Sequence, residues 1–383
     1  MKVFVIAGEP SGDRLGAALM QGLAALRPDV TFAGVGGEQM TAAGLHSLFP
    51  MDELSVMGLA EILPRYAQLR RRLRQTVEAV LAEAPDVLIG IDSPGFCLRV
   101  ARAVRRVRHI RTVQYVAPSV WAWRPGRARK MAAHVDQVLA LLPFEPPLME
   151  AAGMRCDFVG HPVVAEPRAS AEEVAAFRRR HGLDGAPLLL ALPGSRQGEV
   201  SRLSPVFGAA LARLAAARPD LRVVVPAAAP VAGAVVGAVA SWPGAPVVLD
   251  PRGQDLDVAA REKRAAFAAA DVALAASGTV SLELAAARTP MAIAYDMNWM
   301  SWQILSRLLR VDTVTLVNLV TGTRVVPEFL GPACRPGPIA AALEGVLAAP
   351  EAQRAALEAT MRILGEGGAP PGLRAARAVL DGL

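Results

Sequence analysis

Short runs of apolar residues alternate with longer stretches of helical periodicity along most of the chain. Each run is continuous rather than alternating between apolar and polar residues, which is typical of parallel strands buried on both faces of a sheet. Between the runs, Ala, Leu and Arg recur at helical spacing. The pattern therefore predicts an α/β protein with doubly wound parallel sheets. The expected strands are 2–7, 30–35, 86–91, 112–116, 137–142, 188–192, 222–226, 246–249, 272–275 and 291–294.

The series of strands is interrupted once, around residues 160–171, and then restarts. A chain of 383 residues also exceeds the size at which one hydrophobic core usually keeps growing. We therefore expect two doubly wound domains, residues 1–165 and residues 166–335. Residues 336–383 show only helical patterns. This helical tail is expected either to return to the first domain or to pair with a second copy of the chain in a homodimer.

The composition supports well-packed cores, because 53% of the residues are hydrophobic and 20% are charged. The formal net charge is +6, and ten basic residues but no acidic residue lie between Asp92 and Asp136. Such a block attracts anions, whether lipid headgroups, phosphates or nucleic acid. A solvated, arginine-rich helix face is the commoner explanation, and the sequence leaves both open.

The three cysteines, Cys97, Cys156 and Cys334, are widely spaced and form no CxxC or Cys/His pair. We therefore expect neither a disulfide framework nor a zinc site, which fits a reducing, cytoplasmic setting. The printed sequence opens directly with a strand pattern, so no signal peptide is expected. Because it contains no uninterrupted apolar run of about 18 residues, no segment is expected to span a membrane.

The first expected strand leads into the loop GEPSGD, residues 8–13, and then into a helix. Small residues such as Ser11 and Gly12 let backbone N–H groups approach a ligand, and a helix N-terminus favours an anion. The GxGxxG and GxxxxGKS/T fingerprints are absent, which disfavours a nicotinamide or ATP enzyme, and no cofactor is expected. An ordinary turn capped by Ser11 or Asp13 is the alternative.

Asp92 follows the expected strand 86–91 and precedes Pro94 and Gly95, which end the regular backbone. A carboxylate at the carboxyl end of a strand points toward the region in which open α/β sheets bind ligands. That position suits a general base. A cap or turn aspartate explains the same spacing equally well.

Two loops of the second half have the character of a nucleotide-diphosphate site, and the first is Gly194-Ser195-Arg196. It follows the expected strand 188–192 and precedes a helix that begins near Glu199. An arginine in such a loop can bind a diphosphate through two parallel hydrogen bonds.

The other loop is Ser277-Gly278-Thr279, which follows a strand and opens a helix that contains Glu283. A helix start of this kind can cradle a diphosphate, and a glutamate one turn further on can accept hydrogen bonds from the vicinal hydroxyls of a ribose. Helix capping explains the two hydroxyl residues as well. The presence of both loops in one domain favours the nucleotide site.

Two features bear on a lipid or sugar ligand. Trp121 and Trp123 could stack on a sugar, contact acyl chains or simply cover a sheet edge. The apolar stretch 57–64 leads into a helix whose arginines lie largely off its apolar stripe, which is typical of a helix at an anionic membrane surface. Packing of the stripe on the core is the alternative. The arginines are Arg65, Arg70, Arg71, Arg72 and Arg74.

A series of short motifs extends over essentially the whole chain. The motifs are AGEPSGD (7–13), VMG with Glu61 (56–61), GIDSPGF (90–96), YVAPSVWAWR (115–124), LPFE (142–145), GHP (160–162), LPGSR (192–196), ASGTVSLE (276–283) and the region of Asn318. In these motifs and their order the chain resembles the lipid-A-disaccharide synthases. The combination of the first and fourth motifs is the most distinctive part of the resemblance.

The resemblance implies a glycosyltransferase-B fold, with two Rossmann-like domains and a C-terminal helix that returns to the first. It implies transfer of 2,3-diacylglucosamine from UDP-2,3-diacylglucosamine to 2,3-diacylglucosamine 1-phosphate, with a β-1′,6 linkage and release of UDP. The first domain would bind the acceptor and its lipid, and the second the UDP-sugar. Such substrates imply a cytoplasmic protein held peripherally at the inner face of the inner membrane.

Matched motif by motif, Asp92 takes the place of the family's proposed base, Glu9 that of its N-terminal site glutamate and Arg196 that of its diphosphate arginine. Residues 276–283 resemble the nucleotide-binding segment, with Asn318 nearby.

In an inverting displacement, Asp92 would remove the proton of the attacking hydroxyl, and Arg196 would meet the charge that develops on the diphosphate. No acidic pair of the DxD type stands at a loop tip, so no metal is expected. Cys97 stands where the family often has Asn, so the contact beside Asp92 is expected to differ.

Two other functions remain as alternatives. A UDP-sugar epimerase or another transferase on the same fold would use the loops of the second half, but an epimerase has no need of the apolar 57–64 stretch or of the paired tryptophans. A nucleic-acid-binding protein would use the arginine block. That block lacks an aromatic platform and any recognised motif, so we expect no nucleic-acid partner.

Overall fold

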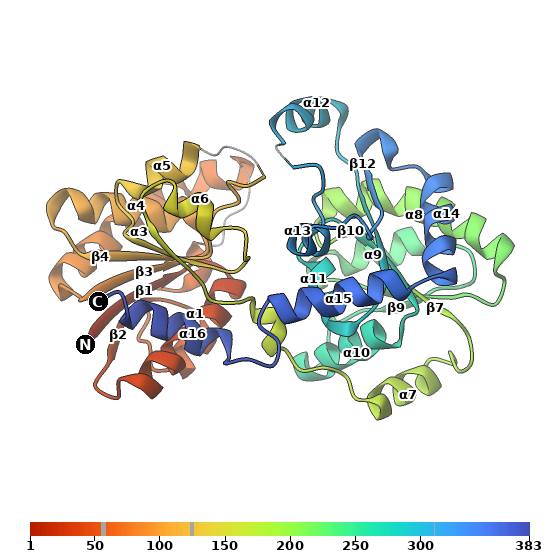
Figure 1. Cartoon of the computed structure of the whole chain (residues 1–383), viewed down its shortest axis with the longest axis horizontal. Coiled ribbons are helices and arrows are strands. Elements are labelled where there is room, and N and C mark those ends of the chain that lie inside the picture. Colours follow the sequence, from red (N-terminus) through yellow and green to blue (C-terminus); the bar gives the residue numbers. More distant parts are fainter. Residues whose placement is uncertain (55–58, 123–125, 310) are drawn as a thin grey trace. The chain divides into compact units, whose positions relative to one another are not determined.

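The chain folds as two compact units (Figure 1). The first unit comprises Met1–Ala165 and Leu364–Leu383, and the second Glu166–Ile363. Each contains a six-stranded parallel sheet between helices, so the predicted class of two doubly wound, Rossmann-like α/β domains is confirmed. The computed structural model describes residues 1–54, 59–122, 126–309 and 311–383, with the backbone only at 59–65, 299–301, 304 and 305.

The sheet of the first unit has the strand order β2-β1-β3-β4-β5-β6. Because the order reverses between β1 and β3, the loops that follow these two strands lie side by side at a topological switch point. β3 is buried along its whole length, which explains its continuous apolar sequence. The strands are β1 (Lys2–Ala7), β2 (Thr31–Val35), β3 (Val87–Ile91), β4 (Arg111–Tyr115), β5 (Gln137–Ala140) and β6 (Arg155–Phe158).

Helices cover the two faces of this sheet (Figure 1). They are α1 (Pro10–Leu26), α2 (Glu38–Ala42), α3 (Leu59–Glu83), α4 (Pro94–Val107), α5 (Gly126–Ala132), α6 (Pro146–Glu150) and α16 (Pro371–Leu380), with short 3-10 turns η1 (Met51–Glu53) and η2 (Pro162–Ala165).

The helical segment 336–383 is divided between the units. Its last helix, α16, lies against α1 in the first unit, as Figure 1 shows. The two helices meet at glycines: a Cβ on Gly22 would lie 2.7 Å from the Gly372 carbonyl oxygen, and one on Gly372 would lie 2.5 Å from that of Ala18. The Gln137 side chain also donates a hydrogen bond of 2.9 Å to the Ala378 carbonyl.

The second sheet has the order β12-β11-β10-β7-β8-β9, and its order reverses between β10 and β7. The loops after these two strands therefore lie side by side at a second switch point. The strands are β7 (Leu188–Leu192), β8 (Arg222–Pro226), β9 (Val247–Leu249), β10 (Val272–Ala276), β11 (Met291–Tyr295) and β12 (Glu328–Leu330).

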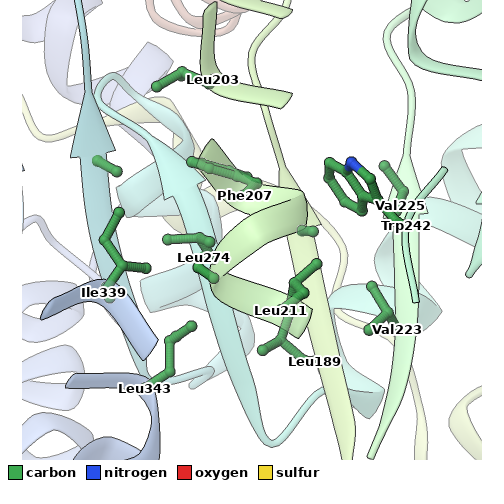
Figure 2. Close-up of a cluster of buried hydrophobic side chains, with 14 of the residues drawn as sticks. Leu189, Leu203, Phe207, Leu211, Val223, Val225, Trp242, Leu274, Ile339 and Leu343 are labelled. Carbon is green, nitrogen blue, oxygen red and sulfur yellow. The ribbon is translucent and has the colours of Figure 1, made fainter. Parts of the chain in front are cut away.

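The core of the second unit lies between this sheet and helices α8 and α14 (Figure 2). Phe207 and Leu211 of α8 pack with Leu274 of the sheet and with Ile339 of α14. The helices are α7 (Ala171–Arg180), α8 (Gln197–Ala217), α9 (Ala232–Val239), α10 (Leu256–Ala269), α11 (Val280–Ala287), α12 (Trp299–Leu308), α13 (Leu316–Thr321), α14 (Pro336–Ala348) and α15 (Glu351–Ile363), with 3-10 turns η3 (Ala229–Val231) and η4 (Gly331–Ala333).

All ten expected strands are present, and two further strands, β6 and β12, were not expected. Both lie at an edge of their sheet, and they are only four and three residues long. A short edge strand buries little apolar surface, so it carries polar residues and lacks the continuous apolar run of a central strand.

Candidate functional site

Seven of the residues predicted to bind the donor line one cavity of about 900 Å³ in the second unit. The cavity lies at the carboxyl ends of β7 and β10, which are neighbouring parallel strands. Its position at the switch point of the sheet is the place where ligands of open α/β sheets bind. The seven residues are Gly194, Ser195, Arg196, Ser277, Gly278, Thr279 and Glu283.

The loop after β7 is shaped by Glu199, a residue that the sequence indicated only as the start of a helix. Its carboxylate accepts hydrogen bonds from the backbone N–H groups of Ser195 at 3.0 Å and Arg196 at 3.3 Å. Gly194 adopts a φ of 121°, and a Cβ there would lie 2.5 Å from the Cβ of Glu199. The glycine is therefore required both for its backbone conformation and for the close approach of this glutamate.

Arg196 projects from this loop as the N-cap residue of α8. Its side chain is 66% exposed and pairs with Glu199 through a contact of 3.3 Å between Nη1 and Oε1. A guanidinium that stays permanently charged and is steadied at one nitrogen is well suited to bind an oxyanion with its others. Because Glu199 already takes the N–H groups of Ser195 and Arg196, the arginine side chain is the main anion-binding group that this loop offers.

The loop after β10 leaves its hydroxyl groups available. Thr279 is the N-cap residue of α11, but its side chain makes no capping hydrogen bond. The Ser281 hydroxyl, by contrast, donates to the Gly278 carbonyl at 2.9 Å and steadies the turn. Gly278 and Thr279 are exposed, and Ser277 is half-buried. Capping therefore does not explain Thr279.

Glu283 lies in the first turn of α11 and accepts a hydrogen bond of 2.5 Å from the Lys263 ammonium of α10. The ammonium also lies 5.2 Å from the centre of the Phe267 ring. Lys263 lines the same cavity, and the sequence analysis did not identify it. One signal was present, since it is one of only three lysines in a chain with 41 basic residues.

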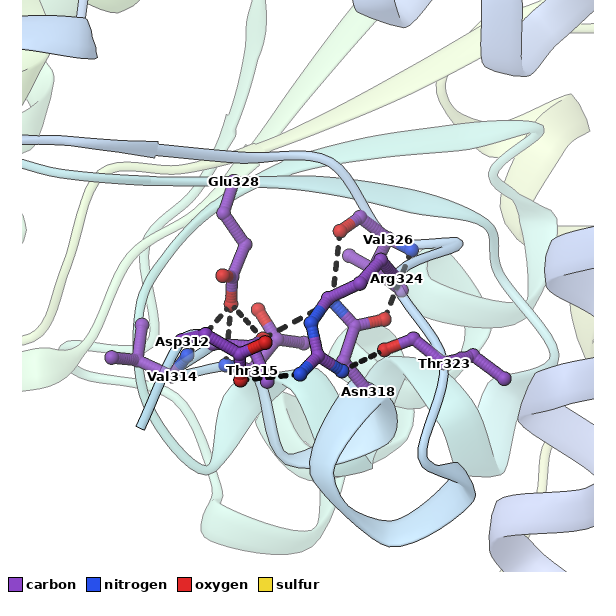
Figure 3. A network of polar contacts seen from close by, with 9 residues as sticks. Asp312, Val314, Thr315, Asn318, Thr323, Arg324, Val326 and Glu328 are labelled. Atoms are coloured by element: carbon purple, nitrogen blue, oxygen red, sulfur yellow. Dashed lines mark hydrogen bonds and ion pairs between the residues drawn. The ribbon is translucent and has the colours of Figure 1, made fainter. Parts of the chain in front are cut away.

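Asn318 is not brought to this cavity. It is completely buried, and its side-chain amide donates 2.9 Å to the Val326 carbonyl while its oxygen accepts 3.1 Å from the Val326 N–H (Figure 3). Glu328 closes the same loop by accepting from Thr313 Oγ1 and from the N–H of Thr315. In this structure Asn318 thus connects the two ends of the segment between α13 and β12.

A second group of predicted residues meets at the switch point of the first sheet, where β1 and β3 are neighbours. The Ser11 hydroxyl donates to Asp92 Oδ2 at 3.3 Å. Gly12 is buried beside them, and a Cβ there would lie 3.8 Å from the Asp92 Cβ. Glu9 is half-buried at the N-cap of α1, and its side chain does not cap the helix.

Asp92 and Ser93 both adopt positive φ, 50° and 38°. Each such residue costs on the order of 1 kcal/mol, so the turn persists only because its surroundings hold it. The Asp92 N–H donates to the Tyr115 carbonyl at 2.9 Å, and the Asp92 carbonyl accepts 3.1 Å from the Gln114 side chain. The strained turn places the half-buried Asp92 carboxylate at the carboxyl end of the sheet.

The alternative explanation of the first loop as a capped turn is only partly met. Asp13 is buried and caps a helix, but the helix is α2 rather than α1: its carboxylate accepts from the N–H groups of Gly37 at 2.8 Å, Gln39 at 3.0 Å and Met40 at 3.0 Å. Ser11 caps neither helix and contacts Asp92 instead.

Cys97 lies at the start of α4, is buried, and points its thiol toward the Ile6 carbonyl at 3.7 Å. Burial raises the pKa of this thiol to about 12. It therefore stays protonated and supplies packing rather than charge beside Asp92. All three cysteines are buried and free.

His161, the histidine of the GHP motif, is poorly placed to act as a second candidate for the base. Burial lowers its pKa to about 4, so the ring is neutral at neutral pH. Its Nδ1 accepts a hydrogen bond of 3.2 Å from the Val163 N–H, which places the ring proton on Nε2. A neutral ring with a protonated Nε2 can donate a hydrogen bond but cannot accept a proton at that nitrogen.

Glu145 of the LPFE motif is a buried carboxyl group that the sequence analysis did not single out. Burial raises its pKa to about 7, although it accepts a hydrogen bond of 3.0 Å from the Leu142 N–H. Its neighbour Phe144 makes an edge contact with Trp121, with ring centres 5.4 Å apart. Trp121 therefore packs on this loop, whereas Trp123 lies outside the described residues.

Helix α3 is the basic helix that was predicted to follow the apolar stretch, and the structure differs from the expectation at one of its arginines. Arg72 is not a solvated charge: it pairs with Glu53 at 2.5 Å and lies 4.6 Å from the centre of the Phe49 ring. Arg70, Arg71 and Arg74 are exposed. The apolar stripe formed by Leu69, Leu73 and Val77 packs on the core of the unit, which was the alternative to a membrane-facing stripe. Residues 55–58, and hence the VMG motif, lie outside the described residues, and only backbone is described at 59–65.

No helix among the described residues has both the length and the apolar character needed to cross a membrane. The same residues contain no cluster of three or more His, Cys, Asp or Glu side chains arranged to hold a metal ion.

Comparison with known proteins places this chain among related sequences and folds. A family model described as lipid-A-disaccharide synthetase matches residues 3–364. The lipid-A-disaccharide synthase of Ruegeria pomeroyi is 66% identical over 383 residues, which cover 100% of this chain and 96% of that protein. That of Rhodospirillum centenum is 49% identical and covers 99% of this chain and 94% of its own length.

Among solved structures, the fold is similar to that of the UDP-GlcNAc 2-epimerase from Neisseria meningitidis bound to UDP-GlcNAc. The TM-score is 0.64 over 100% of this chain and 99% of that one, at 11% identity. This likeness concerns the fold alone. The family match and the two full-length relatives show that the chain belongs to the lipid-A-disaccharide synthase family of glycosyltransferases.

Proposed function

We propose that the protein transfers 2,3-diacylglucosamine from UDP-2,3-diacylglucosamine to the 6-hydroxyl of 2,3-diacylglucosamine 1-phosphate, with inversion at the anomeric carbon. The products are the β-1′,6-linked disaccharide 1-phosphate and UDP. The observation that carries the proposal is the placement of two chemically different groups at the two switch points: a carboxylate in the first unit, and an arginine with a hydroxyl-bearing helix start in the second.

In the proposed reaction Asp92 accepts the proton of the 6-hydroxyl as its oxygen bonds to the anomeric carbon. The bond between that carbon and the diphosphate oxygen breaks, and its electron pair leaves with UDP. A base must be ionised and accessible, and Asp92 is half-buried with a hydrogen bond from the Ser11 hydroxyl. Glu9, at the adjacent helix start, is the second acidic group that we assign to this site.

In the second unit, Arg196 binds the diphosphate and stabilises the charge that develops as it leaves. The exposed turn of Ser277, Gly278 and Thr279 supplies further donors, and Glu283 accepts hydrogen bonds from the ribose. We assign no cofactor and no metal to the reaction. The first unit then holds the acceptor and its acyl chains, and the second holds the UDP-sugar.

The lipid substrates imply a peripheral association with an anionic membrane at its cytoplasmic face. Arg70, Arg71 and Arg74 are exposed on α3 and supply positive charge for such a contact. A homodimer through the C-terminal helices stays a prediction, which sedimentation at several protein concentrations tests.

The proposed reaction is tested by incubating the purified protein with both substrates and analysing the products. Thin-layer chromatography should show a disaccharide 1-phosphate that forms only when both substrates are present, and proton NMR should show a β anomeric linkage. An α linkage would contradict the single displacement. Conversion of the UDP-sugar alone into an isomer would favour an epimerase.

A further inference from the structure

We propose that Lys263 is a positioning residue of the nucleotide site, which holds the Glu283 carboxylate in the orientation that receives the ribose hydroxyls of a nucleoside diphosphate. The inference rests on the proposed nucleotide site and adds a residue to it.

The first support is the geometry of the pair. The Lys263 ammonium donates to Glu283 Oε2 at 2.5 Å, and among the described residues Glu283 Oε1 accepts no hydrogen bond. Both side chains line the 900 Å³ cavity. One carboxylate oxygen is thus fixed by the lysine, while the other is left for a donor that enters the cavity. A ribose with two vicinal hydroxyl donors matches such an acceptor.

The second support is the way in which Lys263 itself is fixed. Its ammonium lies 5.2 Å from the centre of the Phe267 ring, one helical turn further along α10. Phe267 is only 4% exposed, so the ring is a rigid surface for the cation. The half-exposed lysine is therefore steadied by a buried ring and can in turn steady the Glu283 carboxylate.

The third support is the side-chain type. Lysine is rare in this chain, in which arginine supplies nearly every basic residue. An ammonium is a compact charge with three donors, whereas a guanidinium is a planar fork that would span both carboxylate oxygens. A lysine beside Glu283 therefore leaves an oxygen free that an arginine would occupy.

The test measures binding of UDP and of 2′,3′-dideoxy-UDP to the full chain by isothermal titration calorimetry. For Lys263→Met we expect UDP affinity to fall by roughly fivefold, the upper range for a partly exposed ion pair, while affinity for the dideoxy compound stays within about twofold. Lys263→Arg should behave like Lys263→Met toward UDP, because the fork engages both oxygens.

The matched control is Lys2→Met, which breaks a comparable Lys2–Glu83 pair of 2.9 Å in the first unit. It should leave both affinities unchanged. If Lys263→Met lowers the affinity for both compounds equally, or for neither, the positioning role is wrong while the nucleotide site stands. If UDP does not bind the parent protein at all, the proposed nucleotide site is wrong and the inference falls with it.

Discussion

The loops that follow β3 and β7 both leave a sheet at its topological switch point, but they are held by different means. After β3, Asp92 and Ser93 sit in strained backbone with φ of 50° and 38°. The Asp92 carboxylate receives one hydrogen bond of 3.3 Å, from the Ser11 hydroxyl, and forms no ion pair with any described residue. After β7, the Glu199 carboxylate binds two backbone N–H groups and the Arg196 guanidinium.

The difference follows from the chemistry that we assign to each loop. A general base loses basicity when a cation is paired with it, so its position must come from the backbone and from neutral hydrogen bonds. An arginine remains charged whatever its partner, so a neighbouring carboxylate can orient it without removing its function. We therefore propose that backbone strain orients the reacting carboxylate and that charge pairing orients the diphosphate-binding arginine.

The largest expected effect comes from removing basicity at the strained loop. Asp92→Asn keeps the shape and the backbone contacts, so it should lower kcat by about 10²–10⁴ and abolish the acidic limb of the pH–rate profile. Steady-state kinetics from pH 5 to 9 measures both. Glu9→Gln is the companion variant, because it neutralises the second acidic group that we assign to this site. If kcat survives in Asp92→Asn, the base lies elsewhere.

The exposed arginines of α3 are the part of the first unit that we expect to contact a membrane. Replacing Arg70, Arg71 and Arg74 by Gln should weaken binding to anionic vesicles, by up to about 1 kcal/mol for each charge near the surface. The effect should shrink as salt is added. Flotation with anionic and with zwitterionic vesicles measures it.

Arg72→Gln is the matched control for this prediction, because Arg72 pairs with Glu53 instead of facing solvent. It should leave vesicle binding unchanged and lower the thermal midpoint. The Arg72 guanidinium holds the pKa of Glu53 at about 2, below its ordinary value of 4.5. The pair therefore contributes stability above about pH 4.5 that is lost as the pH falls toward 2.

Equal flotation of the parent and of the variant that lacks Arg70, Arg71 and Arg74, at every salt concentration, would rule out a role of these arginines in membrane binding.

The smallest effects concern stability and should differ between the two loops. Glu199→Ala removes the carboxylate that binds the loop after β7, and should lower the free energy of unfolding by about 1 kcal/mol. Ser93→Gly relieves a positive φ and should leave stability unchanged or raise it by up to about 1 kcal/mol. Urea unfolding measures both. A large loss in Ser93→Gly would mean that the turn is not strained.

The central parts of the fold could be predicted from the sequence, because buried parallel strands carry continuous apolar runs. The edge strands β6 and β12 could not, since they bury little surface. The loops after β3, β7 and β10 could also be identified from the sequence as candidate site segments, because small residues and charges at strand ends are conspicuous and a family resemblance supported them. The roles of their residues stay predictions.

Residues that act through a partner were harder to predict. The sequence suggested a solvated Arg72, but its guanidinium pairs with Glu53. The buried Asn318 contacts Val326 and does not line the cavity. Lys263 and Glu283 are 20 positions apart on different helices, so their pairing depends on how α10 and α11 pack. Local pattern carries no information on such contacts, which arise only in the folded unit.

The assignment of the base to the loop after β3 and of diphosphate binding to the loop after β7 is tested most directly by calorimetry, in which UDP is titrated into Asp92→Asn and Arg196→Ala. The account predicts that Asp92→Asn binds UDP within about twofold of the parent. For Arg196→Ala it predicts a loss of roughly 10- to 150-fold, the equivalent of a charge-assisted hydrogen bond of about 1.5–3 kcal/mol. Equal weakening of UDP binding by both variants, or parent-like binding by Arg196→Ala, would contradict it.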